Sequence, residues 1–514
     1  MDGGTRLPSA SGTRRGGGRA RTWFLIHSWL GFKLSLVLGV ICLSGSLASV
    51  SHEIDWLLTP TLRSSAPPSA PMAWEAAGDA LAAAYPGARI GTVRAPEGPG
   101  FAATAIVTLP DGRQRIAHLD PSTGCVQGDA SRQTVQRFLR DLHMWLFITN
   151  SWGLVIVSAF SVPLLASLVT GLVVYKRFWR GFFRLRLRAG SRVLVGDLHR
   201  LIGLWSLWFV AAIGVTSFWY LIEVIGYMNG HRFDRPVPAV PAQSLADLGA
   251  APRPLGLGEV TRLARAAYPG LQVVAVVTAR SVREPVVVWG QDAAWLVRER
   301  ANAVRLHPVT GAVLDIQRGE ALTPMQRVVE TADPLHFGNF GGLPVKLFYF
   351  VFGLGLTGLI VSGGWLALRR GTRLWRAAGL SKTDSWRLGR WRWANIALLG
   401  TATALAPAAL SAWEDGGTPR DVGTRDLGPY QVTLLWQENG PAAQRGLHLR
   451  LDCGGCLANL RSAWLRTEGQ PDLPIRLASS LGSSPVAQHG PDRELSIEIE
   501  AWDGMRTTAR WVTD

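Results

Sequence analysis

Four histidines stand beside long apolar segments of this chain, at His27, His143, His199 and His336. Each segment has about 20 or more mostly apolar residues, the length that crosses the roughly 30 Å hydrocarbon layer of a membrane. A titratable group at the end of such a segment is costly to bury, and more often than not it marks a functional site. Because the imidazole nitrogen is a strong metal ligand, the four residues suggest metal coordination at the membrane boundary.

The composition is typical of a membrane protein that also has soluble parts. Of the 514 residues, 47% are hydrophobic and 18% are charged, and there are 22 tryptophans. The net charge of +16 comes largely from arginines gathered beside the apolar segments. That arrangement is typical of the cytoplasmic flanks of membrane spans, and we expect no nucleic-acid partner.

The apolar segments divide the chain into spans and loops. The predicted parts are a disordered cytoplasmic tail (1–21), a first span (22–50), an external α+β domain (51–140), a second span (143–175), a basic cytoplasmic loop (176–198), a third span (199–226), a second external α+β domain (227–335), a fourth span (336–368), a second basic cytoplasmic loop (369–390), a fifth span (391–412) and a β-rich external domain (413–514). The fold class expected is therefore an α-helical membrane bundle of four core helices plus a fifth, with two α+β domains and a small β-rich C-terminal domain.

Basic loops set the predicted orientation. Residues 176–192 contain seven Lys or Arg, residues 369–392 contain eight, and the N-terminal tail is rich in arginine. Because such loops stay on the cytoplasmic side, we expect the N-terminus in the cytoplasm and the large domains on the other side.

An internal repeat relates the two halves of the chain. The segment Ala83–Gly87 recurs as Ala266–Gly270, and the Pro-x-Thr-Gly turn that begins at Pro121 recurs at Pro308. His27 then corresponds to His199, and His143 to His336. By the predicted topology the first pair opens helices on the cytoplasmic side and the second pair opens helices on the external side.

This placement predicts two b-type haems, one near each membrane face. A six-coordinate haem iron takes two imidazoles, and haem sites in helical bundles are built from facing helices. Gly31 and Gly203 follow His27 and His199 by four residues, on the same helix face, where a missing side chain leaves room for a flat macrocycle. Arg21, Arg140, Arg200 and Lys346 are near enough in sequence to pair with haem propionates. The alternative is that these histidines only sit at the headgroup level.

The segments that carry the histidines resemble a known family. His27–Gly31, Asp141–His143, Asp197–Gly203 and Pro334–Gly342 are similar to the PepSY-associated transmembrane family of iron-regulated membrane proteins, which includes ferric-siderophore reductases. The resemblance covers about residues 20–372. It implies two periplasmic PepSY domains in the bacterial inner membrane, bound haem b, and reduction of a ferric siderophore or another Fe(III) chelate.

Two further features bear on function. No nucleotide-binding glycine motif in a βα context is present, so the electron donor is expected to be separate, a quinol or a cytoplasmic reductase. Cys453 and Cys456 form a Cys-Gly-Gly-Cys pair, which fits a redox pair, a metal site or a local disulfide. The alternative function is a membrane-anchored PepSY binding or regulatory module without haem or redox activity.

Overall fold

The computed structural model describes two stretches of the chain, residues 17–377 and 420–512. The gaps within them are 68–70, 110–112, 149–150, 176–181, 236, 239, 242–243, 245–252, 280–283, 428–429, 438–445, 453–459, 468–472, 475–480, 484–493 and 502–505. The predicted tail up to residue 16, the predicted fifth span (391–412) and the pair Cys453 and Cys456 lie outside the described residues.

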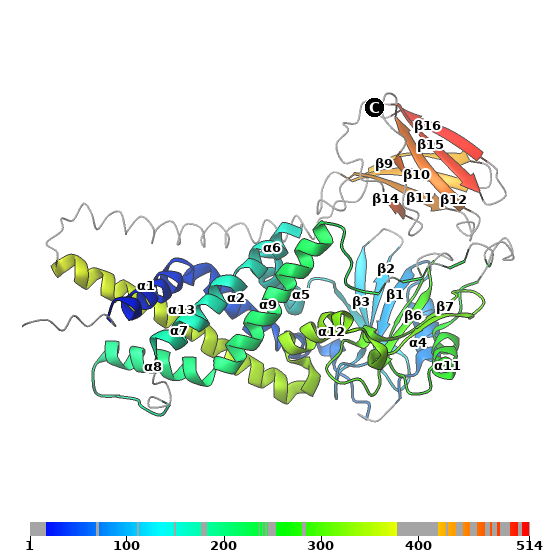
Figure 1. Ribbon diagram of the computed structural model, residues 1–514. Coiled ribbons are helices and arrows are strands. Elements are labelled where there is room, and N and C mark those ends of the chain that lie inside the picture. Colours follow the sequence, from blue (N-terminus) through cyan, green and yellow to red (C-terminus); the bar gives the residue numbers. More distant parts are fainter. Residues whose placement is uncertain are drawn as a thin grey trace, which may run out of the picture.

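A bundle of helices lies beside a mixed unit of sheet and helices, and α12 sits where the two meet (Figure 1). The helices of the bundle and its boundary are α1 (Gly17–Lys33), α2 (Ser35–Ala48), α3 (Ser51–Leu58), α5 (Val135–Trp145), α6 (Ser151–Ala159), α7 (Ser161–Val174), α8 (Ser191–Trp205), α9 (Leu207–Met228), α12 (Pro324–Phe337) and α13 (Gly342–Ala377). The short turns η1 (Pro60–Leu62) and η5 (Asn339–Gly341) flank them.

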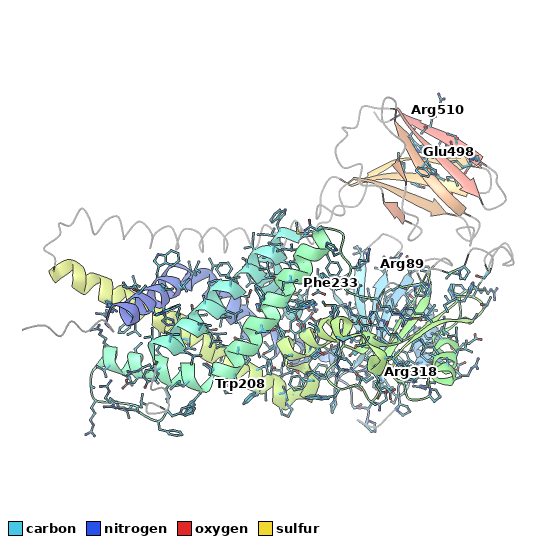
Figure 2. The ribbon with its side chains drawn as sticks, viewed as in Figure 1. Arg89, Trp208, Phe233, Arg318, Glu498 and Arg510 are labelled. Atoms are coloured by element: carbon cyan, nitrogen blue, oxygen red, sulfur yellow. The ribbon has the colours of Figure 1, made fainter. Side chains whose placement is uncertain are left out.

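Three helical stretches of the described chain are long and apolar enough to cross a membrane. They are Ser151–Val174, which joins α6 and α7, then Leu207–Met228 and Asn339–Arg370. A fourth results if Thr22–Gly31 and Ser35–Ala48 count as one span, bent by 62°. Aromatic side chains such as Trp208 project from the bundle, as Figure 2 shows, and apolar side chains exposed in this way suit a lipid environment.

The bundle helices break at repeated places beside the histidines. Leu34 separates α1 from α2 and Ser206 separates α8 from α9, in each case seven residues after a histidine (34 − 27 = 7 and 206 − 199 = 7). On the other side, α5 ends two residues after His143 and α12 ends one residue after His336. The predicted spans 143–175 and 336–368 therefore each begin with a histidine that belongs to a shorter preceding helix.

The two repeats share one antiparallel sheet of eight strands, in the order β4-β3-β2-β1-β5-β6-β7-β8. The strands are β1 (Arg89–Arg94), β2 (Ala103–Thr108), β3 (Gln114–Leu119), β4 (Val126–Ser131), β5 (Gln272–Val277), β6 (Val286–Gln291), β7 (Asn302–Leu306) and β8 (Val313–Gln317). Helices α4 (Trp74–Ala84) and α11 (Leu257–Ala267) pack on this sheet, and η3 (Glu299–Ala301) and η4 (Gly319–Ala321) are short turns beside it.

The two repeats pair with each other at the middle of the sheet. Val93 of β1 pairs with Val276 of β5, and the difference of 276 − 93 = 183 residues is the same offset that relates the two Tyr-Pro-Gly motifs. This pairing places a pseudo-twofold axis at the centre of the sheet. One apolar core, with Leu81 and Val260 among its members, extends under both repeats. The two predicted α+β domains thus share one sheet, in which pairing of β1 with β5 removes an exposed edge from each half.

The repeated motifs stabilise the sheet unit in similar ways, although the tyrosine partners lie at different places in the two repeats. Tyr85 donates a hydrogen bond to Asp129 (3.1 Å) and Tyr268 donates one to Asp292 (2.6 Å). Asp120 accepts the backbone N–H groups of the first Pro-x-Thr-Gly turn. In the second turn His307 replaces that aspartate, and its Nδ1 accepts the corresponding N–H groups at 3.2 and 3.1 Å. His307 therefore stabilises a turn.

The C-terminal region predicted to be β-rich contains two four-stranded antiparallel sheets, ordered β14-β11-β10-β9 and β13-β12-β15-β16. Their strands are β9 (Arg420–Leu427), β10 (Tyr430–Gln437), β11 (Gly446–Asp452), β12 (Leu460–Thr467), β13 (Leu473–Pro474), β14 (Leu481–Ser483), β15 (Glu494–Ala501) and β16 (Arg506–Val512). Trp511 is buried between the sheets and donates its indole N–H to the carbonyl of Gly423 at 2.9 Å.

The two motif tyrosines predict a loss of stability at high pH. Burial raises the pKa of Tyr268 to about 12, and its bond to Asp292 adds to the shift. Burial and Asp129 likewise raise the pKa of Tyr85 to about 12. A tyrosine in the unfolded chain has a pKa of about 10. The contribution of each tyrosine to the free energy of unfolding is therefore fully present below this pH and is lost as the pH rises to about 12.

Tyr268→Phe should therefore reduce the fall in thermal unfolding midpoint between about pH 10 and 12, and Tyr85→Phe combined with it should reduce the fall further. The measurement is a series of thermal unfolding scans of the purified protein against pH. Parallel curves for wild type and both variants would contradict the expectation.

Candidate functional site

The four sequence-predicted histidines gather as two pairs, each joining the two halves of the chain. The ring centres of His27 and His199 are 6.4 Å apart. Those of His143 and His336 are 6.1 Å apart. Each pair is formed by corresponding members of the repeat, as the sequence analysis expected.

The first pair is held by hydroxyl groups of the facing helices. Nδ1 of His27 lies 3.0 Å from Oγ1 of Thr170 and 3.1 Å from the carbonyl oxygen of Ser167, both in α7. The Thr170 hydroxyl proton is already donated within its own helix, at 2.7 Å to the carbonyl of Ala166. The threonine oxygen therefore accepts, and the proton of this bond belongs to Nδ1 of the histidine.

The ring of His199 is also held by a hydroxyl group that accepts its Nδ1 proton. Nδ1 of His199 lies 2.9 Å from Oγ of Ser362 in α13. That hydroxyl donates to the carbonyl of Leu359 at 3.1 Å, so it too accepts from the imidazole.

The second pair repeats this arrangement near the other end of the bundle. Nδ1 of His143 lies 2.8 Å from the carbonyl of Ile41 in α2, an oxygen that can only accept. Nδ1 of His336 lies 2.8 Å from Oγ1 of Thr216 in α9, and this hydroxyl donates to the carbonyl of Ala212 at 2.8 Å. All four rings are therefore Nδ1–H tautomers, which leaves a lone pair on each Nε2 for a metal.

The ring separations fit a six-coordinate iron. An iron between two imidazoles lies about 2.0 Å from each nitrogen, and each ring centre lies about 1.1 Å further back, so such ligation needs centres roughly 6 Å apart. Both observed separations agree with that requirement. Among the described residues, no group of three or more His, Cys, Asp or Glu gathers in a way that could hold a metal ion. A metal at either pair would need a carrier that supplies its other ligands, as a porphyrin does.

A cavity of about 730 Å³ lies beside His27 and His199. Gly31 and Gly203 both line it, and a Cβ built on Gly31 would meet no atom within 4 Å. The two glycines named from the sequence thus border open space next to the imidazoles. His143 and His336 do not line this cavity, so their fit to a cofactor rests on the ring separation and the Nδ1 bonds.

A third glycine, Gly45 of α2, lies against the second pair. A Cβ at this position would lie 2.5 Å from Cε1 of His143, closer than any real contact allows. Only the absence of a side chain lets the His143 ring reach the carbonyl of Ile41 in the same helix. This role of Gly45 was not predicted from the sequence.

Several arginines line the cavity beside His27 and His199. They are Arg186, Arg192, Arg200 and Arg370. Asp197, fully buried two residues before His199, holds two of them: Nε and Nη2 of Arg186 lie 2.9 and 3.0 Å from its oxygens, and Arg200 also pairs with it. The loop that contains Arg186 is thereby fixed against α8.

The other cations proposed for propionates have different surroundings. Lys346 pairs with Glu53 at 2.9 Å, and the Arg140 guanidinium lies 5.9 Å from the Phe337 ring centre. The Arg21 side chain lies outside the part of the molecule that the structure describes. Of the three cations whose side chains the structure describes, Arg200 is the one that lines the cavity.

Sequence reasoning missed the hydroxyl partners of the rings. Thr170, Thr216 and Ser362 are hydroxyl residues in mostly apolar spans, but so are Ser167, Ser217 and Thr357, so residue type alone did not identify them. Their pairing with particular histidines depends on helix rotation and could not be read from spacing within one segment. Asp197 could have been found from the sequence, because Asp141 stands two residues before His143 in the same way. Asp141 also pairs with an arginine, Arg137, at 2.8 Å.

Comparison with known proteins places this arrangement in a family. A family model described as the PepSY-associated TM region matches residues 24–370, which include all four histidines. An uncharacterized protein from Pseudomonas aeruginosa is 39% identical over 79 residues, 15% of this chain. The match covers 20% of that relative, so the chain spans only about a fifth of its length.

Asp197→Asn should free the loop that borders the cavity. The change removes the negative charge that binds Arg186 and Arg200, and hydrogen bonds to charged groups contribute about 1.5–3 kcal/mol. Cleavage by trypsin after Arg184, Arg186 and Arg188 should become about tenfold faster or more, because the loop opens more often. Asp79→Asn, an exposed change on α4, serves as the control. Equal cleavage rates for Asp197→Asn and wild type would contradict the expectation.

Proposed function

Because the chain belongs to the PepSY-associated transmembrane family, we propose that it is a membrane electron-transfer protein that binds two b-type haems and reduces an Fe(III) chelate such as a ferric siderophore. The observation that carries this proposal is the repeated geometry of the histidines. Within each pair the ring centres are separated by the distance that an iron ion between two imidazoles requires. Each ring also donates its Nδ1 proton to an oxygen of a facing helix.

His27 and His199 would hold one haem, and His143 and His336 the other. When bound, the haems would carry single electrons from a separate donor, a quinol or a cytoplasmic reductase, to the Fe(III) chelate. The residues of the chain have the task of fixing the rings. Thr170, Ser362, Ile41 and Thr216 each hold one imidazole in the tautomer and direction that ligation requires.

Cations at the cavity mouth suit the carboxylates of such a cofactor. Arg192 and Arg370 line the cavity with Arg200, and the Arg370 guanidinium lies 4.3 Å from the ring centre of Phe24. Arginine binds carboxylates in a bidentate manner, and its strength rises where water is excluded. These residues would orient the propionates toward the side of the bundle opposite the sheet.

The proposed topology has four core spans, with the bent helix pair α1 and α2 as the first. A fifth span over 391–412 and the C-terminal domain complete it. We place the protein in the bacterial inner membrane, with the basic loops and the N-terminus in the cytoplasm and the α+β unit in the periplasm, because the basic loops follow the positive-inside rule.

An Fe(III) chelate is a suitable acceptor on the side of the α+β unit. Ferric ion binds hard oxygen donors tightly, and its reduced form is softer, less charged and more readily released from them. Neither a haem nor a chelate requires further catalytic side chains for this one-electron step.

Haem content per chain tests the proposal directly. Pyridine extraction with optical spectroscopy of the purified protein should give a value near two, with visible bands of a reduced b-type haem. His199→Ala and His336→Ala should each reduce the value to near one, because each removes an axial ligand from a different pair. His52→Ala, whose ring pairs with Glu97 at 2.9 Å, is the control and should leave the content unchanged.

A colourless protein would instead favour the alternative, a PepSY binding or regulatory module without redox activity. A content near one in the wild type would mean that one of the two pairs has another role.

Gly45→Ala should act on the second pair alone. The added methyl group would meet the His143 ring, so the ring must move from its bond with Ile41. We expect the haem content to fall toward one per chain, although alanine favours a helix over glycine by about 1 kcal/mol. Gly39→Ala in the same helix is the matched control, because its nearest atom would lie 3.8 Å away. If both variants keep two haems, His143 is not held as described.

A further inference from the structure

The loop between β6 and β7 distinguishes the second repeat from the first. It comprises residues 292–301, whereas the corresponding connection between β2 and β3 comprises only 109–113. The longer loop exposes Trp295, and the next residue, Leu296, has a φ of 58°. A branched apolar residue in this left-handed region is an outlier, which the surrounding contacts must maintain.

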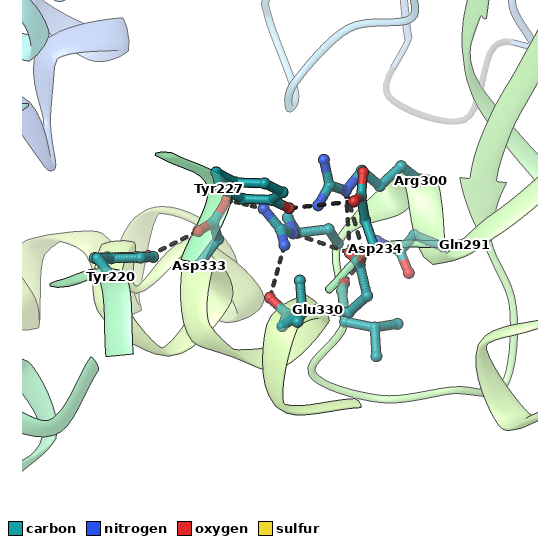
Figure 3. A network of polar contacts seen from close by, with 10 residues as sticks. Tyr220, Tyr227, Asp234, Gln291, Arg300, Glu330 and Asp333 are labelled. Carbon is teal, nitrogen blue, oxygen red and sulfur yellow. Dashed lines mark hydrogen bonds and ion pairs between the residues drawn. The ribbon is translucent and has the colours of Figure 1, made fainter. Parts of the chain in front are cut away.

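Ion pairs tie this loop to the boundary helix α12. Arg298 contacts the carboxylates of Glu330 and Asp333, each at 2.9 Å, and Arg300 pairs with Glu330 at 3.1 Å. Arg298 also donates to the carbonyl of Val329 at 2.7 Å. Figure 3 shows this network, with Asp333 between the loop and Tyr220.

The same network ties the loop to a candidate membrane span. Tyr220 of α9 donates to Asp333 at 2.7 Å, and it lies eight residues before the end of the candidate span at Met228 (228 − 220 = 8). Through Asp333 and Arg298 the loop is therefore held near this end of the span.

The Trp295 side chain is placed there by a second, separate contact. Its ring centre lies 6.2 Å from that of Phe340, which belongs to the candidate span Asn339–Arg370. The backbone carbonyl of Trp295 also accepts from Arg327 of α12. The indole nevertheless remains 68% exposed, whereas the described aromatic side chains of the sheet and of α4 and α11 are buried or half-buried.

Other exposed apolar side chains lie on the neighbouring helices α12 and α13. Met325 and Val328, one turn apart on α12, are 50% and 47% exposed. Leu343, at the start of α13, is 48% exposed and continues directly into the span. Together with Trp295 and Phe340 these residues are called the Trp295 patch; they lie on the loop, on α12, on η5 and at the start of α13, beside the candidate span Asn339–Arg370.

We propose that the Trp295 patch inserts into the lipid headgroup region, so that the 292–301 loop docks the second repeat on the membrane surface. Tryptophan is enriched at this level because its ring is apolar and its N–H can still bond to headgroups or water. The partner is the bilayer that the chain itself spans, since the patch begins at a span end. Docking braces α12 through Arg298, whose partner Asp333 stands three residues before His336.

Photocrosslinking in membranes tests the docking. A benzophenone amino acid is placed at position 295 of the full-length protein in nanodiscs of phosphatidylethanolamine and phosphatidylglycerol, and lipid adducts are measured by mass spectrometry. The same probe at Val361, which is 62% exposed on the span, gives the yield of a lipid-facing site. The probe at Glu259, exposed on α11 of the same repeat, gives the background.

The yield at position 295 should approach that at Val361 and exceed that at Glu259 about tenfold, as expected for a site in the headgroup region. A yield no higher than at Glu259 would overturn the proposal, and so would adducts at 295 that contain only protein. Since no haem enters the measurement, its result is independent of the proposed redox function.

Discussion

The structure depends on one recurrent interaction, the hydrogen bond from Nδ1 of a half-buried imidazole to an oxygen of a facing helix. A ring nitrogen inside an apolar bundle must find a partner, because an unsatisfied buried polar group costs about 1–3 kcal/mol. Three of the four partners are Ser or Thr hydroxyls whose protons already serve their own helix, as at Thr170 and Thr216. These oxygens can only accept, so they fix the tautomer as well as the direction of each ring. The lone pair of Nε2 is then free for a ligand, and the ring centres within each pair are 6.4 and 6.1 Å apart.

Duplication explains why each histidine pair joins corresponding residues of the two halves of the chain. The paired β1 and β5 strands place a pseudo-twofold axis at Val93 and Val276, so each half of the sheet has an equivalent position. Helix α5 follows β4 and α12 follows β8, at the two ends of the strand order. The sheet therefore sets how α5 and α12 approach each other, and these helices carry His143 and His336. In this way the α+β unit is a positioning element for one histidine pair.

Much of this organisation could be predicted from the sequence, because it depends on features visible along the chain. Apolar length predicted membrane helices, family membership was predicted and is confirmed, and the repeat predicted which histidines meet. Haem binding, siderophore reduction and orientation remain predictions. The helix breaks at Leu34 and Ser206, the common sheet and the role of Gly45 were not predictable. Each depends on contacts between distant segments, which local propensity and periodicity do not encode.

The apolar core between the two pairs bears on the function proposed above, in which electrons rather than ions would be the transported charge. Ser362, the partner of His199, and Tyr349, which bonds to the carbonyl of Leu335, lie on the same helix α13, 13 residues apart (362 − 349 = 13). That spacing is about 20 Å along the helix axis. The bundle core between them is apolar, with Phe209, Leu356 and Ile360 among its buried members. A metal ion crossing this core would lose its hydration without gaining ligands, at a cost of many kcal/mol. An electron would need no such hydration, so an apolar spacer between two ligand pairs is compatible with the relay proposed above.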